Sequence, residues 1–365
     1  MRIIFDYQTF SIRQAGGISR YFTELAIALG SLEGADVRVI APLLASTLLA
    51  RRRDDIRVTG FDLSTVGILP TRVVRGINRV LFPLVAKSAK PDIVHETQYE
   101  RSNFSFHGAK KIITIHDMIP ERFPELFPSL ELHRGNIRRA IQRANMIICV
   151  SESTRRDLLE FYEPCPENVR VVPLASSITP VTTKPEEEEE PYFLHVGARY
   201  SYKNFLALVT AFGISKLWKT HRLITFSEMT FTIEELEAID SAQIPRERIR
   251  GIGGNDSKLA SYYAGATALV VPSLYEGFGI PVVEAMRCGC PVIASNISSL
   301  PEVGGDAIRC FDPREPEAIA EMMRRVAEDS TLRENMVFQG RAQAARFSWN
   351  KCARETYAVY KHALR

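Results

Sequence analysis

The segment from Pro272 to Pro301 constrains the fold of this chain more than any other stretch. It reads PSLYEGFGIPVVEAMRCGCPVIASNISSLP and follows the apolar residues 268–271, which are typical of a buried strand. A glycine-bracketed turn over residues 276–279 precedes Pro281, which suits the first turn of a helix because its missing N–H is not needed there. Residues 291–294 then form the next strand. A loop of small residues therefore joins the carboxyl end of a strand to a helix N-terminus, a position where open α/β sheets bind anionic ligands.

Two glutamates give this segment a more specific chemistry than anion binding. Glu276 lies at the start of the glycine turn, and Glu284 follows eight residues later, about one turn into the helix. Both can face the same crevice, and a carboxylate accepts hydrogen bonds from two neighbouring hydroxyls, such as the vicinal diols of sugars and riboses. The spacing alone leaves a second interpretation open, in which Glu284 complements the helix N-terminus and Glu276 is solvated.

The pattern P-S-x-x-E-G-F-G-x-P-x-x-E-A-M-x-x-G-x-P-V-I-A-S resembles the donor-site signature of family 4 glycosyltransferases, which are retaining enzymes. The resemblance implies the GT-B fold, an α/β architecture of two Rossmann-like domains with a cleft between them and a C-terminal helix that crosses back to the first domain. By the same resemblance, Glu276 binds the donor sugar and Glu284 binds the ribose hydroxyls. The amides of four loop residues would assist the diphosphate: Gly277, Phe278, Gly279 and Ile280.

Length and composition agree with two soluble globular domains. A chain of 365 residues is too long for one ordinary core. The resemblance implies an acceptor-binding domain over residues 1–180, joined by a C-terminal helix over 347–365, and a donor-binding domain over 191–346. The segment 181–190, VTTKPEEEEE, is polar, charged and self-repelling, which favours a linker without a chemical role for its five glutamates.

The sequence contains no sign of export or of a metal site. No apolar run approaches the roughly 20 residues that span a bilayer, and Asp6 comes too early for a secretory signal. The six cysteines lack a metal-like CxxC pair, so packing of reduced thiols in the cytoplasm is the simplest interpretation. No carboxylate-rich cluster appears, which agrees with a site that needs no metal or cofactor. We therefore expect a cytoplasmic protein. Peripheral attachment to the inner membrane face is compatible with this location.

The positive charge of the chain is concentrated in its first half. Residues 1–184 carry an excess of six positive charges, and residues 185–365 carry an excess of three negative ones. An anionic partner is therefore expected on the first half.

Residues 71–86 are the most amphipathic stretch. Five apolar residues share one face, and three arginines recur at helical spacing on another: Val73, Ile77, Val80, Leu81 and Leu84, with Arg72, Arg75 and Arg79. The pattern fits a surface helix whose basic face is solvated. It also fits docking on an anionic membrane surface or on a polyprenyl-diphosphate-linked acceptor.

A glycine pair follows the first strand, residues 2–6. Gly16 and Gly17 precede a helical pattern over residues 18–29, a geometry that cradles phosphate, although the residues alone favour a plain turn. The sequence GGISRYFTEL is similar to a glycine-rich loop of the family, and this similarity implies that the loop faces the donor phosphates or the acceptor.

Three polar residues follow strands in the first half of the chain. His116 and Asp117 end the strand 111–117, and His95 lies in V-H-E-T at the end of the strand before it. A histidine in such a place is ordinarily a hydrogen-bonded structural residue. However, T-I-H-D-M-I-P matches the T-x-H-D motif of the family, which implies that His116 approaches the transferred sugar. His95 and Asp117 are secondary candidates for contact with the acceptor.

Two cations follow the first strand of the second half, residues 192–197. Arg199 and Lys203 lie in G-A-R-Y-S-Y-K-N-F, a strand-to-helix loop that suits a diphosphate leaving with growing negative charge. The residues alone favour ordinary surface cations, and it is the resemblance to a basic pair of the family that implies the diphosphate role. The chain reads Ser-Glu-Met at 227–229, where the family usually has a glycine-rich strand end. This departure argues against base contacts from that loop.

The sequence therefore predicts a retaining, metal-independent hexosyltransferase. It would move a sugar from a nucleotide-diphospho-sugar to a saccharide or lipid-linked saccharide acceptor, in the biosynthesis of a surface polysaccharide such as lipopolysaccharide. The stretches GGISRY and ARYSYKNF look most like bacterial O-antigen and polysaccharide mannosyltransferases, which makes GDP-mannose the first expectation. The expected catalytic residues are His116, Arg199, Lys203 and Glu276. No nucleic-acid partner is expected, and front-face attack and a covalent intermediate on Glu276 both stay open.

Two other kinds of function fit the same architecture. A GT-B phosphorylase would need a cofactor-bearing lysine in the second domain, where no such motif is visible, and an epimerase is a further enzyme alternative. A catalytically inert protein would bind the sugar nucleotide without turnover. The intact set of catalytic candidates together with Glu284 argues against inertness.

Overall fold

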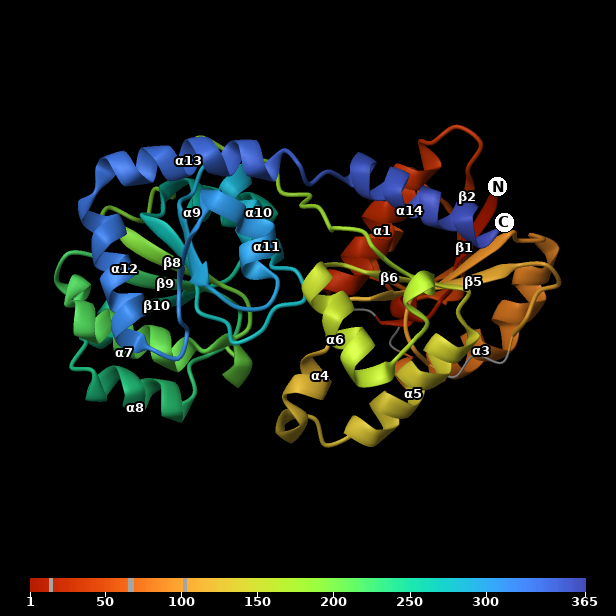
Figure 1. Ribbon diagram of the computed structural model, residues 1–365, viewed down its shortest axis with the longest axis horizontal. Helices are drawn as coiled ribbons and strands as arrows, with labels where there is room; N and C mark the ends of the chain where they lie inside the picture. Colours follow the sequence, from red (N-terminus) through yellow and green to blue (C-terminus); the bar gives the residue numbers. More distant parts are fainter. Residues whose placement is uncertain (13–15, 65–68, 101–103) are drawn as a thin grey trace. The chain divides into compact units, whose positions relative to one another are not determined.

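The computed structural model describes residues 1–12, 16–64, 69–100 and 104–365. These residues form two compact units. Unit 1 comprises Met1–Leu174 and Ser348–Arg365, and unit 2 comprises Ala175–Phe347. Each unit contains one parallel sheet with helices on both faces (Figure 1). The predicted pair of Rossmann-like sheets is therefore confirmed.

The sheet of unit 1 has the strand order β3-β2-β1-β4-β5-β6-β7. Its strands are β1 (Arg2–Phe5), β2 (Asp36–Leu44), β3 (Arg57–Asp62), β4 (Ile93–Glu96), β5 (Lys110–Ile115), β6 (Met146–Cys149) and β7 (Val169–Val171). From β1 the chain adds β2 and β3 on one side of the sheet and then β4 to β7 on the other, so the strand order switches between β1 and β4. The carboxyl ends of these two strands form the crevice where such sheets ordinarily bind ligands.

The helices of unit 1 lie on both faces of this sheet. They are α1 (Gly17–Gly30), α2 (Thr47–Ala50), α3 (Thr71–Ser88), α4 (Ile119–Arg122), α5 (Leu130–Arg143), α6 (Glu152–Tyr162) and α14 (Trp349–Ala363). Figure 1 shows α1 and α14 together on one face and α3 and α5 on the other. The predicted return of the C-terminal helix to the first domain is confirmed, because α14 packs against α1 and its Tyr360 is fully buried.

Unit 2 repeats the topology with the strand order β10-β9-β8-β11-β12-β13. Its strands are β8 (Tyr192–Val196), β9 (Arg222–Phe226), β10 (Ile249–Ile252), β11 (Ala268–Val271), β12 (Val292–Ser295) and β13 (Arg309–Phe311). Its helices are α7 (Phe205–Ser215), α8 (Ile233–Ser241), α9 (Asp256–Gly265), α10 (Ile280–Arg287), α11 (Leu300–Gly304), α12 (Pro316–Glu328) and α13 (Ser330–Ala344). Here the strand order switches between β8 and β11, which are neighbouring parallel strands.

The strands are apolar because helices cover them on both faces. Central strands such as β5, β11 and β12 consist largely of Ile, Val, Leu and Ala, and their apolar side chains are buried. In unit 2 the core between the sheet and helices α7 and α12 is filled by residues such as Phe193, Phe212 and Met323. These rigid sheets fix the strand ends from which the loops of the site extend.

The acidic segment before β8 packs on unit 2, which differs from the solvated linker expected from its composition. Glu190 accepts hydrogen bonds from Arg222 at 2.6 Å and from Arg248 at 2.7 Å. Glu188 is buried and contacts Arg250 and the hydroxyl of Tyr262. Arginines at β9 and β10 therefore neutralise the carboxylates that would otherwise repel one another.

Helix α3 lies on the surface of unit 1 with Arg72 and Arg79 exposed, but it does not pack through its apolar face. Its buried residues are Val74, Asn78, Phe82 and Ala86, whereas the apolar residues of the predicted face all point to solvent. Asn78 can face the core because its amide donates to Ser11 Oγ and to the Leu43 carbonyl, both at 2.9 Å, and accepts from the Leu43 amide. The hydrophobic pattern alone favours burial of the apolar face. The hydrogen bonds of Asn78 stabilise the packing of the opposite face instead. Within the described ranges, no helix is long and apolar enough to cross a membrane.

Candidate donor and acceptor sites

The loop between β11 and α10 has the predicted strand–turn–helix form. Gly279 is the N-cap of α10 with φ +94°, a left-handed conformation that strongly favours glycine. A Cβ atom at this position would also lie 2.8 Å from Leu300 Cδ2, so any other residue would require Leu300 to shift. Pro281 lies in the first turn of α10, as expected. The loop therefore brings backbone amides to a helix N-terminus, where they suit an anion.

Glu276 is held in this loop by four polar contacts. Its Oε1 accepts from Ser273 Oγ and from Lys203 Nζ, each at 2.7 Å. Its backbone amide donates to Ser298 Oγ at 2.9 Å, and its carbonyl accepts from Ser299 Oγ at 2.8 Å. Glu276 is 8% exposed, so its carboxylate is fixed in position yet reachable from solvent at one edge. The sequence analysis missed the three serines, although Ser273 belongs to the P-S-x-x-E pattern.

Lys203 is the predicted cation that lies beside this carboxylate. It follows β8, and the structure joins the carboxyl ends of β8 and β11 through it. The side chains of Lys203 and Glu276 are 17% and 11% exposed, so their charges interact with little screening by water. The two predicted site residues are thus brought together from opposite sides of the topological switch point.

Arg199 has a different environment. Its side chain is completely buried, and its Nε donates to Glu235 Oε1 at 2.7 Å. Its Nη2 donates to the carbonyls of Met229 and Thr230, while the guanidinium packs over the ring of Phe231 at 4.5 Å. Nη1 is also buried, and it has no hydrogen-bond partner among the described residues. The guanidinium therefore secures the loop after β9, and Nη1 is the atom left for any ligand.

Glu235 was not singled out by the sequence analysis, because its role depends on a partner far away in the chain. It caps α8 by accepting from the Thr232 amide at 2.8 Å, while its other oxygen binds Arg199. Such a capping glutamate has an ordinary sequence signature, T-x-x-E, which gives no sign of the second bond.

Glu284 lies on α10 and is 8% exposed. The buried hydroxyl of Tyr263 on α9 donates to its Oε2 at 3.0 Å. This bond and the negative charge of Glu284 contribute to a pKa of Tyr263 well above the ordinary value, although burial is the main cause. The phenol therefore stays protonated and fixes the orientation of the carboxylate. Tyr263 was missed because a tyrosine in a helix carries no functional signal of its own.

His116 lies at the carboxyl end of β5 in unit 1. Its ring meets those of Tyr21 and Phe22 edge to face, with centroids 5.0 and 5.9 Å away. Its Nε2 is buried and has no hydrogen-bond partner among the described residues. Burial lowers the pKa of His116 to about 4, so the ring is neutral at physiological pH. A neutral imidazole with an unused nitrogen can accept or donate one hydrogen bond to a ligand.

The two secondary candidates are already engaged in hydrogen bonds. His95 is completely buried, and its ring nitrogens contact Tyr360 Oη at 2.6 Å and Thr114 Oγ1 at 2.9 Å. It joins β4 to α14 and presents no surface to an acceptor. Asp117 is partly exposed and accepts from the Ile119 amide at 3.1 Å, which forms the turn into α4.

Gly16 and Gly17 begin α1, and neither has the backbone conformation that requires glycine. The Gly16 amide donates to Ser19 Oγ at 3.0 Å. A Cβ atom at either position would meet nothing within 4 Å among the described residues. Open space above a helix N-terminus leaves room for a ligand, which is compatible with the predicted phosphate or acceptor contact.

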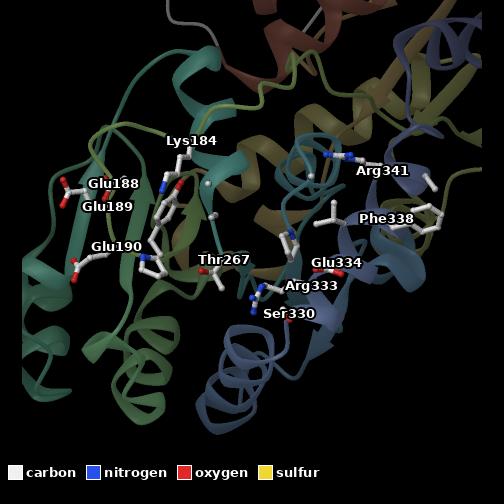
Figure 2. Close-up of a pocket in the computed structure, with 18 residues that line it drawn as sticks. Lys184, Glu188, Glu189, Glu190, Thr267, Ser330, Arg333, Glu334, Phe338 and Arg341 are labelled. Carbon is white, nitrogen blue, oxygen red and sulfur yellow. The ribbon is translucent and has the colours of Figure 1, made fainter.

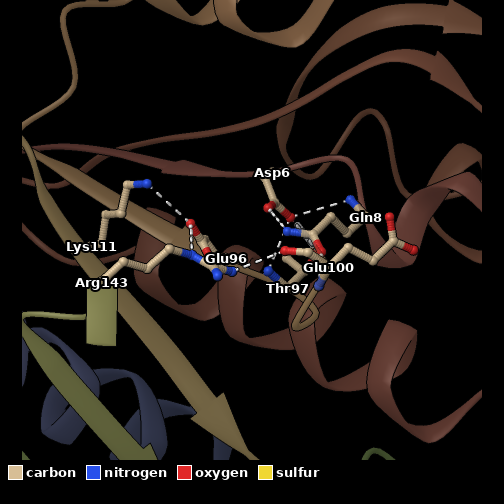
Figure 3. Close-up of polar contacts among 7 residues, drawn as sticks. All are labelled: Asp6, Gln8, Glu96, Thr97, Glu100, Lys111 and Arg143. Atoms are coloured by element: carbon tan, nitrogen blue, oxygen red, sulfur yellow. Dashed lines mark hydrogen bonds and ion pairs between the residues drawn. The ribbon is translucent and has the colours of Figure 1, made fainter. Parts of the chain in front are cut away.

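Buried polar residues occupy the switch point of unit 1 (Figure 3). Asp6, after β1, accepts from the amides of Gln8 and Thr97 and from both of their side chains. Glu96, at the end of β4, is paired with Arg143 and Lys111. Burial and the neighbouring Glu96 raise the pKa of Asp6 to about 7. These contacts hold the residues directly after β4 in place, since Thr97 donates to Asp6 and Glu100 contacts Gln8 and Arg143.

A large cavity of unit 2 does not contain the predicted donor residues. It has a volume of about 880 Å³ and lies at the amino ends of β8, β11 and β12, between the acidic segment and α13 (Figure 2). The loop between β11 and α10, which carries Glu276, lies at the opposite, carboxyl end of these strands. Among the described residues, no group of three or more His, Cys, Asp or Glu could hold a metal ion.

Comparison with known proteins agrees with this arrangement. Residues 15–175 match the family described as Glycosyltransferase Family 4, and residues 181–343 match the family described as Glycosyl transferases group 1. The chain is 30% identical over 267 residues to O-antigen chain mannosyltransferase B of Escherichia coli, covering 69% of this chain and 70% of that protein. It is 27% identical to the serotype-specific mannosyltransferase WbdA of Escherichia coli, covering 67% of this chain and 32% of that longer protein.

Solved structures share the fold over almost the entire chain. Sucrose-phosphate synthase from Thermosynechococcus elongatus superposes with a TM-score of 0.78 at 19% identity, covering 99% of this chain and 98% of that one. Anabaena HepE, solved in complex with UDP-glucose, superposes with a TM-score of 0.74 at 17% identity, covering 99% and 100%. These similarities, the matched families and the two parallel sheets lead to one conclusion: the chain belongs to the family 4 glycosyltransferases and has the GT-B fold.

Proposed function

We propose that this glycosyltransferase moves a hexose from a nucleotide-diphospho-sugar to a saccharide or lipid-linked saccharide acceptor, with retention of configuration and without a metal ion. The observation that carries the proposal is the group formed by Lys203, Glu276 and Glu284 around the loop between β11 and α10. A cation, amides at a helix N-terminus and a fixed carboxylate are the groups that a diphosphate and a ribose need.

The charge of Lys203 is balanced by Glu276 at 2.7 Å. A bound diphosphate would share this cation, and its interaction would strengthen as the leaving group gains charge in the transition state. Glu276 would then be free to accept hydrogen bonds from the sugar hydroxyls. In unit 1, His116 would offer to the sugar or the acceptor a neutral ring whose Nε2 has no hydrogen-bond partner in the described part of the chain. Arg199 would contribute through Nη1 alone.

Mannose from GDP-mannose is the first candidate donor. The support is the names of the relatives, which include O-antigen chain mannosyltransferases of Escherichia coli and Salmonella typhimurium. The solved neighbour HepE was crystallised with UDP-glucose, so a uridine nucleotide is the second candidate. Surface polysaccharide synthesis on the cytoplasmic side of the inner membrane is the setting we propose.

The test uses the purified full chain and a panel of GDP-mannose, UDP-glucose and UDP-galactose. We expect one donor to be hydrolysed slowly without acceptor, to release the α-anomer from an α-linked donor, and to react equally well in EDTA. The variant Glu284→Ala should bind that donor less tightly, by about 1.5–3 kcal/mol in calorimetry. Tight binding of a donor without hydrolysis or transfer would favour the inert binding protein instead.

A further inference from the structure

The solvent side of α3 is apolar, where a surface helix is ordinarily polar. Val80 and Leu84 are 67% and 69% exposed, and Val73, Ile77 and Leu81 are each more than a third exposed. The core contacts of α3 are made by its opposite side. Five exposed apolar side chains on one helix face form a continuous patch that nothing in the described part of unit 1 covers.

The exposed surface of α3 and of the two residues that follow it carries only positive charge. No Asp or Glu occurs from residue 63 to residue 91, whereas Arg72, Arg79, Lys87 and Lys90 are exposed. None of these four cations has an ion-pair partner among the described residues. Arg75 differs, because it pairs with Glu100 at 3.0 Å.

A cavity of about 760 Å³ lies where α3 ends. Its apolar wall includes Leu84, Phe104 and Phe106, and Lys87 and Lys90 lie at its edge. Arg2 and Asp92 also line it, but they neutralise one another at 2.7 Å. The cavity thus combines an apolar surface with two unpaired ammonium groups, which complements a lipid phosphate attached to acyl chains.

We propose that the outer face of α3 and this cavity form a docking surface for an anionic phospholipid bilayer. The apolar side chains enter the boundary between headgroups and acyl chains, while Arg72 and Arg79 lie over the headgroups and Lys87 and Lys90 bind lipid phosphates. An apolar helix face with cations and no carboxylates matches this occupant in both polarity and charge. The lipid-linked acceptor that the surface would bring to the enzyme rests on the proposed function, whereas bilayer binding does not.

The test measures co-sedimentation of the full chain with vesicles at low salt. We expect the wild type to bind vesicles rich in phosphatidylglycerol and to bind pure phosphatidylcholine vesicles weakly. Each cation near an anionic surface contributes about 1 kcal/mol, which is slightly more than a factor of five in binding. Lys87→Gln with Lys90→Gln should therefore lower the partition coefficient roughly 30-fold. Val80→Ser with Leu84→Ser should lower it at least about tenfold by removing apolar contact. High salt should reproduce the effect of the lysine changes.

Matched controls lie on unit 2. Ile233 and Phe338 are 77% and 79% exposed, so Ile233→Ser with Phe338→Ser removes equally exposed apolar groups elsewhere. Lys216→Gln with Lys219→Gln removes two exposed cations. The proposal is overturned if the wild type ignores anionic lipid, or if these controls lose as much binding as the α3 variants. Donor hydrolysis measured without vesicles separates this outcome from a failure of the proposed function, because every docking variant should hydrolyse the donor like the wild type.

Discussion

The two units share one topology but use the crevice between their central strands differently. In unit 1 the ends of β1 and β4 carry Asp6 and Glu96, which are completely or almost completely buried and bonded to protein groups (Figure 3). In unit 2 the ends of β8 and β11 carry Lys203 and Glu276, whose side chains retain access to solvent. Both crevices contain a carboxylate paired with a cation of similar exposure, 14–17%, and they differ in the carboxylate: the side chain of Glu96 is 0% exposed and that of Glu276 is 11% exposed.

This difference shows that the fold provides the location and the local residues decide its use. In unit 1 the carboxylates stabilise the loop after β4, as Arg143 and Lys111 balance Glu96. In unit 2 Lys203 and Ser273 hold the carboxylate of Glu276, Ser298 and Ser299 hold its backbone, and 11% of the side chain stays exposed. The following predictions test whether the pairs differ in function as they differ in exposure.

The largest effect is expected for Arg199, whose charge is buried with that of Glu235. Arg199→Met leaves Glu235 buried without its partner, so we expect a loss of about 3–5 kcal/mol in the free energy of unfolding. Arg199→Met combined with Glu235→Gln removes both charges and should recover most of this loss, measured by urea unfolding. Transfer by the double variant decides the role of the guanidinium.

Recovered transfer would mean that Arg199 acts through the loop after β9. Transfer that stays low in a stable double variant would mean that Nη1 contacts the diphosphate. Equal stability of the single variant and the wild type would contradict the buried ion pair itself.

A smaller effect, on transfer alone, is expected for Lys203. Lys203→Met should lower kcat/KM by about 10²–10³, because the cation interacts most strongly with the leaving diphosphate in the transition state. The matched change in unit 1 is Lys111→Met, which removes a cation 3.5 Å from Glu96 but leaves Arg143 in place. It should leave kcat/KM unchanged. If both variants lost activity equally, the comparison between the two crevices would fail.

The sequence was sufficient to predict the sheets and the strand–turn–helix form of the loop between β11 and α10, because local signals encode them. Gly279 and Pro281 determine the turn and the helix start wherever they occur. The burial of Arg199, the packed acidic segment and the orientation of α3 were not predictable in this way. Each depends on hydrogen bonds to residues distant in sequence: Glu235 for Arg199, Arg248 for Glu190, and Leu43 for Asn78.

Tyr263 should have a modest effect on donor binding. Tyr263→Phe removes one hydrogen bond to Glu284, worth about 0.5–1.5 kcal/mol, so donor affinity should fall by up to about tenfold in calorimetry. Because Tyr263 acts through Glu284, the same change in a Glu284→Ala background should have almost no further effect on affinity. Additive losses in the double variant would show that Tyr263 does not position the carboxylate.

The smallest effect is expected from pH, through His116. Its pKa is lowered to about 4 by burial, whereas an unperturbed histidine has a pKa of about 6.5. The ring is therefore neutral throughout the range where most histidines titrate, and it gains a proton only as the pH falls through about 4. If the neutral ring takes part in transfer, kcat/KM should not change with an apparent pKa near 6.5, and should decline only below about pH 5.

The unfolded chain binds this proton more readily, so the fold also loses stability as the pH falls below about 6.5, and unfolding must be followed at each pH. His116→Asn should lower transfer at every pH and remove the acid limb. An inflection near pH 6.5 that is absent from this variant would contradict a buried, neutral His116.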